Sequence, residues 1–369
     1  MRPPIGSATG TPAEATHPAL ARMSTLDRFL PVWIAAAMVL GLGVGRLIPQ
    51  LNDWLDAVRI GTISLPIAAG LLVMMYPVLA KVRYSEIGRV AADRTMLVTS
   101  LFLNWVVGPA LMFALAWTFL PDQPEFRTGL IIIGLARCIA MVLIWSELAC
   151  GDREATAVLV AINSLFQIVA YSVLGYFYLE LLPAWLGLQT ATLDVSMWDI
   201  GQIVLIFLGI PLVAGYLTRR WGERLRGREW YDTRFIPRIA PWALYGLLFT
   251  VVLLFALQGE VITAQPFDVG LIAVPLLAYF LVMWVGSFAL GLRLRLPYEK
   301  NASVAFTAAS NNFELAIAVS IGVFGVTSGE ALAGVVGPLI EVPVLVGLVY
   351  ISLWGRRRFY PVPPAAAAA

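Results

Sequence analysis

The sequence has little charge, one histidine and two cysteines. Asp, Glu, Lys and Arg make up 13% of its 369 residues, against about 25% in typical soluble domains. The single histidine, His17, excludes a site built from several histidines of one chain. The two cysteines, Cys138 and Cys150, are too few for a disulfide scaffold. Because 60% of the residues are hydrophobic, the composition indicates an integral membrane protein.

The sequence also lacks the motifs of several enzyme classes. It has no G-x-x-x-x-G-K-[ST] loop for ATP, no H-E-x-x-H for zinc and no G-x-S-x-G for a nucleophilic serine. A formal net charge of +2 gives no reason to expect a nucleic-acid partner. We therefore expect a carrier or channel that is not an enzyme, needs no cofactor and has no ATP site of its own.

Apolar stretches long enough to cross a bilayer recur through the chain. A hydrocarbon core about 30 Å thick requires about 20 apolar residues of α-helix. Helices are the expected form because a helix satisfies its own backbone hydrogen bonds in lipid. The sequence predicts an all-α protein with ten spans, roughly at residues 29–48, 60–80, 96–120, 128–149, 154–182, 199–218, 239–258, 268–292, 300–325 and 330–354.

The positions of Lys and Arg give an orientation to these ten spans. If the N-terminus is cytoplasmic, 21 of the 25 basic residues fall on the inside, three fall outside and Arg137 falls within a span. Cytoplasmic loops are enriched in Lys and Arg, so this division matches the positive-inside rule. Both ends of the chain are therefore predicted to be cytoplasmic.

The ten spans divide the chain into two halves of five. Residues 1–28 are predicted to be a disordered cytoplasmic tail, 29–182 the first five-helix repeat and 183–198 an extracytoplasmic connection. The second repeat covers 199–354, and 355–369 form another cytoplasmic tail. An odd number of spans in each half inverts one half relative to the other, as in many secondary transporters.

Polar residues interrupt the fourth and ninth spans in corresponding places of the two halves. The interruptions lie at residues 134–141 and 306–316, where small, amide and charged side chains replace large apolar ones. Such residues in mid-span favour a locally unwound helix whose free backbone groups face a polar cavity. The two interruptions predict broken helices and a substrate site near the midplane of the membrane.

Three charged residues lie well inside the predicted spans, away from their ends, where a charge costs about 2.5–3.5 kcal/mol or more. Arg137 in span four and Glu314 in span nine can pair if the broken helices cross, each offsetting the desolvation of the other. Glu341 in span ten lies between Pro338 and Pro343, which loosen the helix around it. Intramembrane charges are functional by default, although a buried pair can also serve only to fix helix packing.

Cys138 adjoins Arg137 at the expected break in span four. A neighbouring cation and a broken helix favour the reactive thiolate form of a cysteine. A thiolate is a soft ligand that selects thiophilic substrates. Cysteine also packs as a small apolar residue, and that alternative stays open. Met141, one turn further on, either adds a thioether to the site or packs in the core.

Four further side chains are candidates for the lining of a cavity. Asn104 lies in span three, Asn163 and Gln167 in span five, and Phe313 beside Glu314 in span nine. Amide side chains in a span either line a polar cavity or form hydrogen bonds between helices. The sequence does not decide between the two roles.

Three blocks of sequence together form a recognisable pattern. They are GLARCIAMV at residues 134–142 with GDRE at 151–154, NNFELAIA at 311–318, and GPLIEVPV at 337–344. With these blocks, residues 26–356 resemble the arsenical-resistance-3 family of arsenite efflux permeases. The resemblance implies the architecture of the bile-acid/sodium symporter superfamily, with ten spans in two inverted repeats and crossed broken helices. It also implies export of arsenite, and in some members antimonite, by proton antiport across the bacterial inner membrane.

The resemblance assigns roles to particular residues. The family's span-four cysteine corresponds to Cys138, which would bind arsenic, and its acids in spans nine and ten correspond to Glu314 and Glu341, which would carry protons. Sodium-coupled relatives have E-T-G-x-Q-N in span nine, and this chain has SNNFE at 310–314, which argues against sodium coupling. The expected substrate-binding residues are Cys138, Arg137, Asn311, Asn312 and Glu314.

Other functions remain open from the sequence. The main alternative is a sodium-coupled symporter of organic anions, which added sodium would drive. A channel remains open because a permeation site does not prove coupling. A receptor or scaffold would leave the two interrupted spans unexplained. The expected partners are arsenite or antimonite, protons and the lipid bilayer.

Overall fold

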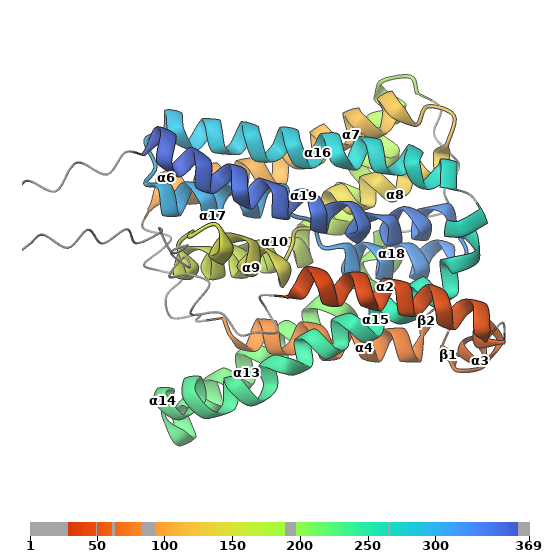
Figure 1. The fold of residues 1–369 in the computed structure, drawn as a ribbon, viewed down its shortest axis with the longest axis horizontal. Helices are drawn as coiled ribbons and strands as arrows, with labels where there is room; N and C mark the ends of the chain where they lie inside the picture. The colour runs from red at the N-terminus through yellow and green to blue at the C-terminus, as the bar shows by residue number, and fades with distance from the viewer. Residues whose placement is uncertain are drawn as a thin grey trace, which may run out of the picture.

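The computed structural model describes residues 29–48, 50–60, 63–82, 93–188, 197–264 and 266–360. The named secondary-structure elements in this part of the chain are helices, apart from one antiparallel pair of short strands, β1 (Arg59–Ile60) and β2 (Ile63–Ser64). The long helices run along the long axis of the molecule (Figure 1). The predicted tail at 1–28, residues 189–196 of the predicted connection, and 361–369 lie outside the described residues.

Among the described residues, six helices are long and apolar enough to cross a membrane, so the chain is a multi-pass membrane protein. At about 1.5 Å per residue, even the shortest, of 26 residues, exceeds the thickness of a hydrocarbon core. Three shorter apolar helices lie at Val32–Leu47, Leu65–Ala80 and Phe313–Phe324. The six long helices are Arg94–Phe119, Arg153–Trp185, Met197–Arg226, Arg228–Gly259, Pro266–Arg293 and Gly329–Phe359.

Four of the long helices contain a five-residue π-helical segment. The first consists of α6 (Arg94–Phe102), η2 (Leu103–Val107) and α7 (Gly108–Phe119). The others are α10 (Arg153–Tyr176), η3 (Phe177–Leu181) and α11 (Leu182–Trp185); α12 (Met197–Val204), η4 (Leu205–Gly209) and α13 (Ile210–Arg226); and α14 (Arg228–Trp230), η5 (Tyr231–Phe235) and α15 (Ile236–Ala264). The remaining two are α16 (Pro266–Arg293) and α19 (Gly329–Phe359).

Two of the long helices continue past the C-terminal ends of their predicted spans into turns that contain several arginines. The sequence places the end of span six at residue 218, and α13 continues to Arg226; it ends span ten at 354, and α19 continues to Phe359. Both extensions carry arginines in their last turn. Basic side chains at a helix C-terminus are favoured by the helix dipole, and they lie outside the hydrocarbon core of the membrane. A helix can therefore continue for several residues beyond the end of its apolar stretch.

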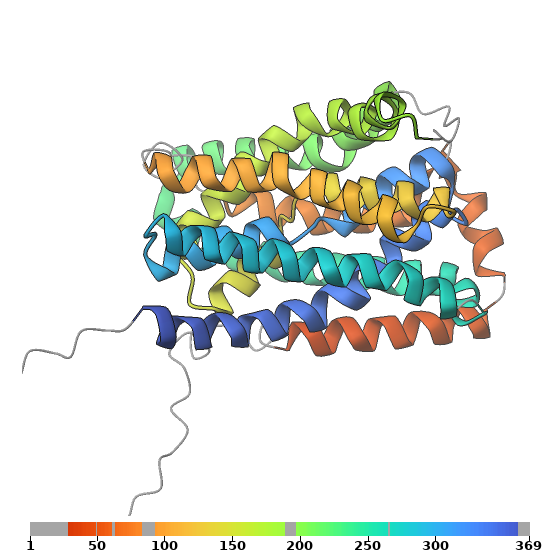
Figure 2. The same ribbon diagram turned by 90° about the horizontal axis from the view of Figure 1, so that it is seen from above.

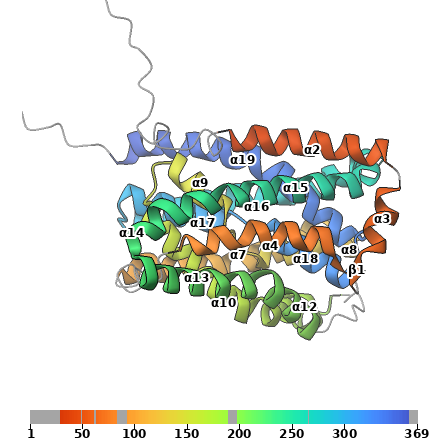
Figure 3. The ribbon, with the colours of Figure 1, turned by 90° about the horizontal axis from the view of Figure 1, so that it is seen from below.

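One face of the molecule is a layer of four helices. In the order α2 (Leu30–Leu47), α15, α4 (Leu65–Ala80) and α13, each packs against the next (Figure 3). The short helix α3 (Leu51–Ala57) lies between α2 and β1 in the chain. We call α2, α4, α13 and α15 the four-helix layer.

The remaining helices form a second group, which we call the core bundle. It includes α6, α7, α10, α16 and α19, and Figure 2 shows α16 and the α6–α7 helix across the face opposite the four-helix layer. Both spans that the sequence predicts to be interrupted are divided into two helices within this bundle. Span four consists of α8 (Pro124–Leu135) and α9 (Met141–Leu148), and span nine of α17 (Tyr298–Ala309) and α18 (Phe313–Phe324).

Candidate functional site

The gaps of the two broken helices meet inside the core bundle. Arg137 and Asn311 form an isolated antiparallel β-bridge. On one side of it the backbone N–H of Cys138 donates to the carbonyl of Ser310 at 3.3 Å, and on the other the N–H of Asn312 donates to the carbonyl of Ala136 at 3.0 Å. These bonds satisfy backbone groups that the helix breaks leave without helical partners.

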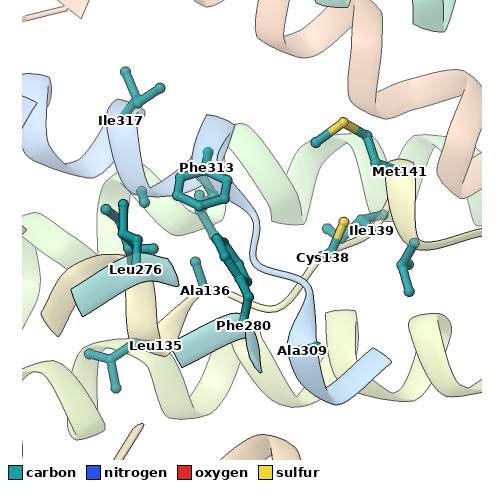
Figure 4. Packing of buried hydrophobic residues seen from close by; sticks show 14 of the residues in the cluster. Leu135, Ala136, Cys138, Ile139, Met141, Leu276, Phe280, Ala309, Phe313 and Ile317 are labelled. Carbon is teal, nitrogen blue, oxygen red and sulfur yellow. The ribbon is translucent and has the colours of Figure 1, made fainter. Parts of the chain in front are cut away.

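The register of this β-bridge determines the face of the crossing to which each side chain points. Successive side chains of an extended segment point to opposite faces, and residues opposite each other in an antiparallel pair share a face. Cys138 and Ser310 therefore lie on one face of the crossing, and Arg137 and Asn311 lie on the other. Figure 4 shows the connection that carries Ala136 and Cys138 next to the one that begins after Ala309.

Arg137 is held within the core bundle. Its side chain is 1% exposed, and Nη1 donates to the hydroxyl of Tyr279 on α16 at 3.0 Å and to the carbonyl of Ala308 at 3.5 Å. Nη2 donates to the carbonyl of Gly134 at the end of α8. Within the described residues no ion pair joins Arg137 to Glu314, so the pairing that the sequence suggested is wrong. Arg137 reaches Tyr279 on α16, whereas Glu314 lines a cavity between the core bundle and the four-helix layer.

The two asparagines of the crossing complete the broken helices. Asn311 Nδ2 donates to the carbonyls of Ile133 at 2.8 Å and of Ala136 at 3.2 Å, where α8 ends. Asn312 is the N-cap of α18, and its Oδ1 accepts from the N–H of Leu315 at 3.0 Å. Within the described residues, Asn311 Oδ1 and Asn312 Nδ2 have no hydrogen-bond partner. Each amide therefore has one polar group left for another molecule.

Glu341 reaches the crossing from α19. Its side chain is fully buried, and Oε1 accepts a hydrogen bond from Ser310 Oγ at 2.6 Å and another from the N–H of Asn311 at 3.3 Å. Its other oxygen, Oε2, has no partner among the described residues. The prolines Pro338 and Pro343 lie within α19 on either side of it, as the sequence indicated.

Cys138 lies among acids rather than beside the guanidinium of Arg137. The thiol is 4% exposed and lies next to the hydroxyl of Ser310 and the N–H of Val142 in the first turn of α9. The charged side chains that act on it are Glu341 and Glu314. The expectation that Arg137 favours the thiolate is therefore wrong, because neighbours along an extended chain point in opposite directions.

A small cavity lies between the core bundle and the four-helix layer. It holds about 20 Å³ of water-accessible space, room for about one water molecule. Glu314, which is 7% exposed, is the one ionisable residue among those that line it, and no other described side chain forms a hydrogen bond or ion pair with it. Met141 lines the cavity as well. The other lining residues are Ile34, Leu247, Thr250, Val251, Leu254, Phe255, Ile317, Val335 and Pro338.

The four remaining candidates lie away from this cavity. Asn104 bonds within its own helix to the carbonyl of Ser100 at 2.8 Å, and Asn163 accepts from the indole of Trp105 at 3.1 Å. Gln167 accepts from the backbone N–H of Arg137 at 2.5 Å and so supports the crossing. Phe313 is buried, with its ring centroid 6.3 Å from that of Phe280 (Figure 4).

Two residues of the site were missed from the sequence. Ser310 contacts both Cys138 and Glu341, and Tyr279 accepts from Arg137. Ser310 directly precedes Asn311 in the interrupted span, so its position was a signal that the sequence offered. Tyr279 lies in an apolar stretch of its helix, and nothing near it in the sequence indicates a partner.

Known proteins are similar to this chain over most of its length. Residues 68–265 match the Sodium Bile acid symporter family. The arsenical-resistance protein Acr3 of Corynebacterium glutamicum is 60% identical over 344 residues, 93% of each chain. This chain belongs to the Acr3 family.

Other relatives agree with this membership. The Acr3 protein of Alkaliphilus metalliredigens is 32% identical over 90% of this chain and 94% of its own length. An uncharacterised transporter of Synechocystis is 37% identical over 89% of this chain and 88% of its own. Because the Corynebacterium match omits only about 25 residues, it includes both broken helices of this Acr3-family chain.

Proposed function

We propose that this chain exports arsenite across the bacterial inner membrane in exchange for protons, with antimonite as the candidate second substrate. The observation that carries the proposal is its 60% identity, over 93% of both chains, to a protein named for arsenical resistance. The position of Cys138 supports it, since a thiol at the meeting point of two broken helices suits a thiophilic substrate.

The proposal includes the full architecture of ten spans in two inverted repeats, with both ends of the chain in the cytoplasm. The division of spans four and nine into α8–α9 and α17–α18 supports it, as does the bridge between their gaps. The short apolar helices Val32–Leu47 and Leu65–Ala80 supply the first two spans. Movement of the four-helix layer against the core bundle then alternates access to the site between them.

Substrate recognition uses the chemistry of trivalent arsenic. Arsenite in neutral water is largely an uncharged trihydroxide, and the thiol of Cys138 displaces one hydroxyl to form an arsenic–sulfur bond and water. Asn312 Nδ2, which has no described partner and lies on the same face of the crossing as Cys138, binds one of the remaining hydroxyls. Asn311 lies on the opposite face and supports the site through its hydrogen bonds to the end of α8. Arg137 acts indirectly, because its guanidinium fixes Gly134, Ala308 and thereby the two ends of the crossing.

Proton coupling is assigned to Glu314 and Glu341. Glu314 lines the cavity between the two groups of helices, so relative movement of the groups exposes its carboxyl first to one side of the membrane and then to the other. Glu341 accepts a hydrogen bond from Ser310, which lies on the same face of the crossing as Cys138. A proton bound to these acids on the outside and released on the inside drives export.

The test uses everted membrane vesicles, in which export is measured as uptake of arsenite. An imposed pH gradient, acidic inside, should drive uptake, and collapsing it with an uncoupler should stop uptake. Cys138→Ser should abolish transport, and Glu314→Gln should abolish its response to the gradient. Cys150→Ser, the same substitution at the other cysteine, is the matched control and should transport normally.

The outcomes separate the proposal from its alternative. Uptake that survives collapse of the gradient contradicts proton antiport. Transport of organic anions that requires sodium, without transport of arsenite, would instead show the sodium-coupled symporter that the name of the wider family suggests. Full activity in Cys138→Ser contradicts thiol binding.

A further inference from the structure

Ser310 is the residue between the cysteine and the buried acid of the crossing. The β-bridge of Arg137 with Asn311 places Ser310 directly opposite Cys138, and the backbones of the two are joined by the 3.3 Å bond from Cys138 N to Ser310 O. Opposite residues of an antiparallel pair have Cβ atoms about 4.5–5.5 Å apart on one face. The Ser310 hydroxyl thus lies beside the thiol.

The same hydroxyl is bonded to Glu341. Ser310 Oγ donates to Glu341 Oε1 at 2.6 Å, a short distance typical of a hydroxyl that donates to a carboxylate. Ser310 and Glu341 are both fully buried. Thiol, hydroxyl and carboxyl therefore form one line of neighbouring groups, from the gap between α8 and α9 through the residue that follows α17 to α19, and all three side chains are buried.

We propose that Ser310 relays a proton between the thiol of Cys138 and the carboxylate of Glu341 while the arsenic–sulfur bond forms and breaks. The inference rests on the proposed function, and it assigns to Ser310 a role that speeds substrate capture and release. Ser310 is a positioning and relay residue, because its hydroxyl acts through its two neighbours.

The step balances without an oxidant or reductant. Ser310 passes its proton to the Glu341 carboxylate and takes the thiol proton, and the Cys138 sulfur attacks trivalent arsenic. Glu341 then returns the proton to the departing hydroxide, which leaves as water. One S–H and one As–O bond break, one S–As bond and one O–H bond form, and arsenic stays trivalent. Release of arsenite is the reverse sequence with water as the nucleophile.

The groups around Cys138 leave the path through Ser310 as the direct route for the thiol proton. Arg137 lies on the opposite face of the crossing and carries no basic group that accepts a proton. The Asn311 and Asn312 amides do not exchange protons readily. Glu314 also acts on the thiol, but no described side chain forms a hydrogen bond with it, and it lines the cavity, where it serves proton coupling in the proposed function. Glu341 retains an unpartnered oxygen, Oε2, from which a proton can be delivered to the leaving hydroxide.

A relay predicts a kinetic signature that a structural role does not produce. Rates of radiolabelled arsenite binding and release are measured by rapid filtration on the purified full chain carrying Cys150→Ser. Ser310→Ala should slow binding and release together, by about 100-fold, the lower range for general acid–base catalysis. The dissociation constant should change less than about twofold, since a relay lowers the barrier in both directions.

Companion variants keep the inference testable. Ser310→Thr restores a hydroxyl and should recover both rates. Glu341→Gln should slow both rates as Ser310→Ala does, and the double variant should be no slower than either. Ser320→Ala is the matched control. Ser320 is a buried serine like Ser310, but its hydroxyl has no described partner and lies outside the line from Cys138 through Ser310 to Glu341. Its rates should equal those of the parent.

The failures are distinguishable. Normal binding rates in Ser310→Ala, or a weakened affinity with unchanged rate of binding, overturns the relay and leaves the proposed function intact. Arsenite binding that persists in Cys138→Ser overturns the thiol step of the proposed function instead, and the relay falls with it.

Discussion

Gln258 and Val326 join the two groups of helices. Gln258 Nε2, near the end of α15, donates to the carbonyl of Val326, between α18 and α19, at 2.9 Å. The donor belongs to the four-helix layer and the acceptor to the core bundle. Gln258 follows Phe255, which lines the cavity, by one helical turn. The bond therefore lies beside the cavity that Glu314 faces.

This bond should hold the two groups together at that end. Gln258→Leu keeps a similar volume and removes the donor. We expect this to destabilise the arrangement in which the two groups touch at this end by about 1 kcal/mol, which lowers the population of that arrangement about fivefold. The expected result is faster modification of Cys138 by a membrane-impermeant thiol reagent added from outside, in a Cys150→Ser background. Gln202→Leu, at an exposed position of α12, is the control. An unchanged modification rate in Gln258→Leu would contradict the role of the bond.

Gly108 provides the space for the guanidinium of Arg137. A Cβ atom there would lie 2.9 Å from Arg137 Nη1 and 3.1 Å from the hydroxyl of Tyr279. Gly108→Ala should therefore lower stability by about 1–3 kcal/mol, the usual cost of overpacking. The measurement is the melting temperature of the purified protein in detergent.

The control for Gly108 lies in the four-helix layer. A methyl group added at Gly43 would have no neighbouring atom within 4 Å among the described residues, so Gly43→Ala should not lower the melting temperature. A similar loss in both variants would show that the cost is one of helix substitution in general rather than of crowding at Arg137.

Asp93 and Lys300 give a pH dependence at one end of the core bundle. Lys300 Nζ donates to Asp93 Oδ2 at 2.6 Å, and this bond, with the N–H of Met96, lowers the pKa of Asp93 below its ordinary value of 3.8 despite partial burial. A carboxyl whose folded pKa is lowered stabilises the fold above its unfolded pKa, and that contribution is lost as the pH falls through the folded pKa. The ion pair should therefore be at full strength at neutral pH.

Two substitutions test the pair. Asp93→Asn should lower the melting temperature at pH 7 by an amount equivalent to about 0.5–1 kcal/mol, because the pair is partly exposed. The difference from the parent should shrink toward pH 3. Lys300→Met should have a similar effect at pH 7, and the double variant should lose less than the sum of the two. Additive losses would show that the two residues do not interact.

The sequence predicts the breaks at the crossing better than it predicts the contacts there. Arg137, Asn311 and Glu314 stand out because each is polar within an apolar run, which is a local signal. The faces on which they lie depend on the register between residues 136–138 and 310–312, which are distant in the sequence. Arg137 and Cys138 therefore seemed to act together, and Ser310 was not recognised.

Glu341 and Phe313 illustrate the same limit. Glu341 was found because a carboxyl between two prolines in a span is unusual, but its bond to Ser310 depends on where α19 packs. Phe313 was expected to line the cavity because it precedes Glu314, yet consecutive residues of a helix point about 100° apart. Its ring instead packs into the core bundle beside Phe280.

Gly337 and Phe313 set how closely α19 approaches the start of α18. A Cβ atom on Gly337 would lie 1.8 Å from Cε1 of Phe313, so the ring must move in Gly337→Ala. Phe313 lies between Asn312 and Glu314, and a displaced ring should displace both. We expect a loss of stability of about 1–3 kcal/mol or more and a loss of arsenite transport.

A second-site change should separate crowding from other effects at Gly337. Phe313→Leu removes the ring, so the double variant Gly337→Ala with Phe313→Leu should be more stable than Gly337→Ala alone. Gly347→Ala lies on the same helix with no described atoms within 4 Å of the added methyl, and it should keep both its melting temperature and its transport. If Phe313→Leu fails to restore stability, the contact between α19 and this ring is not what requires glycine at 337.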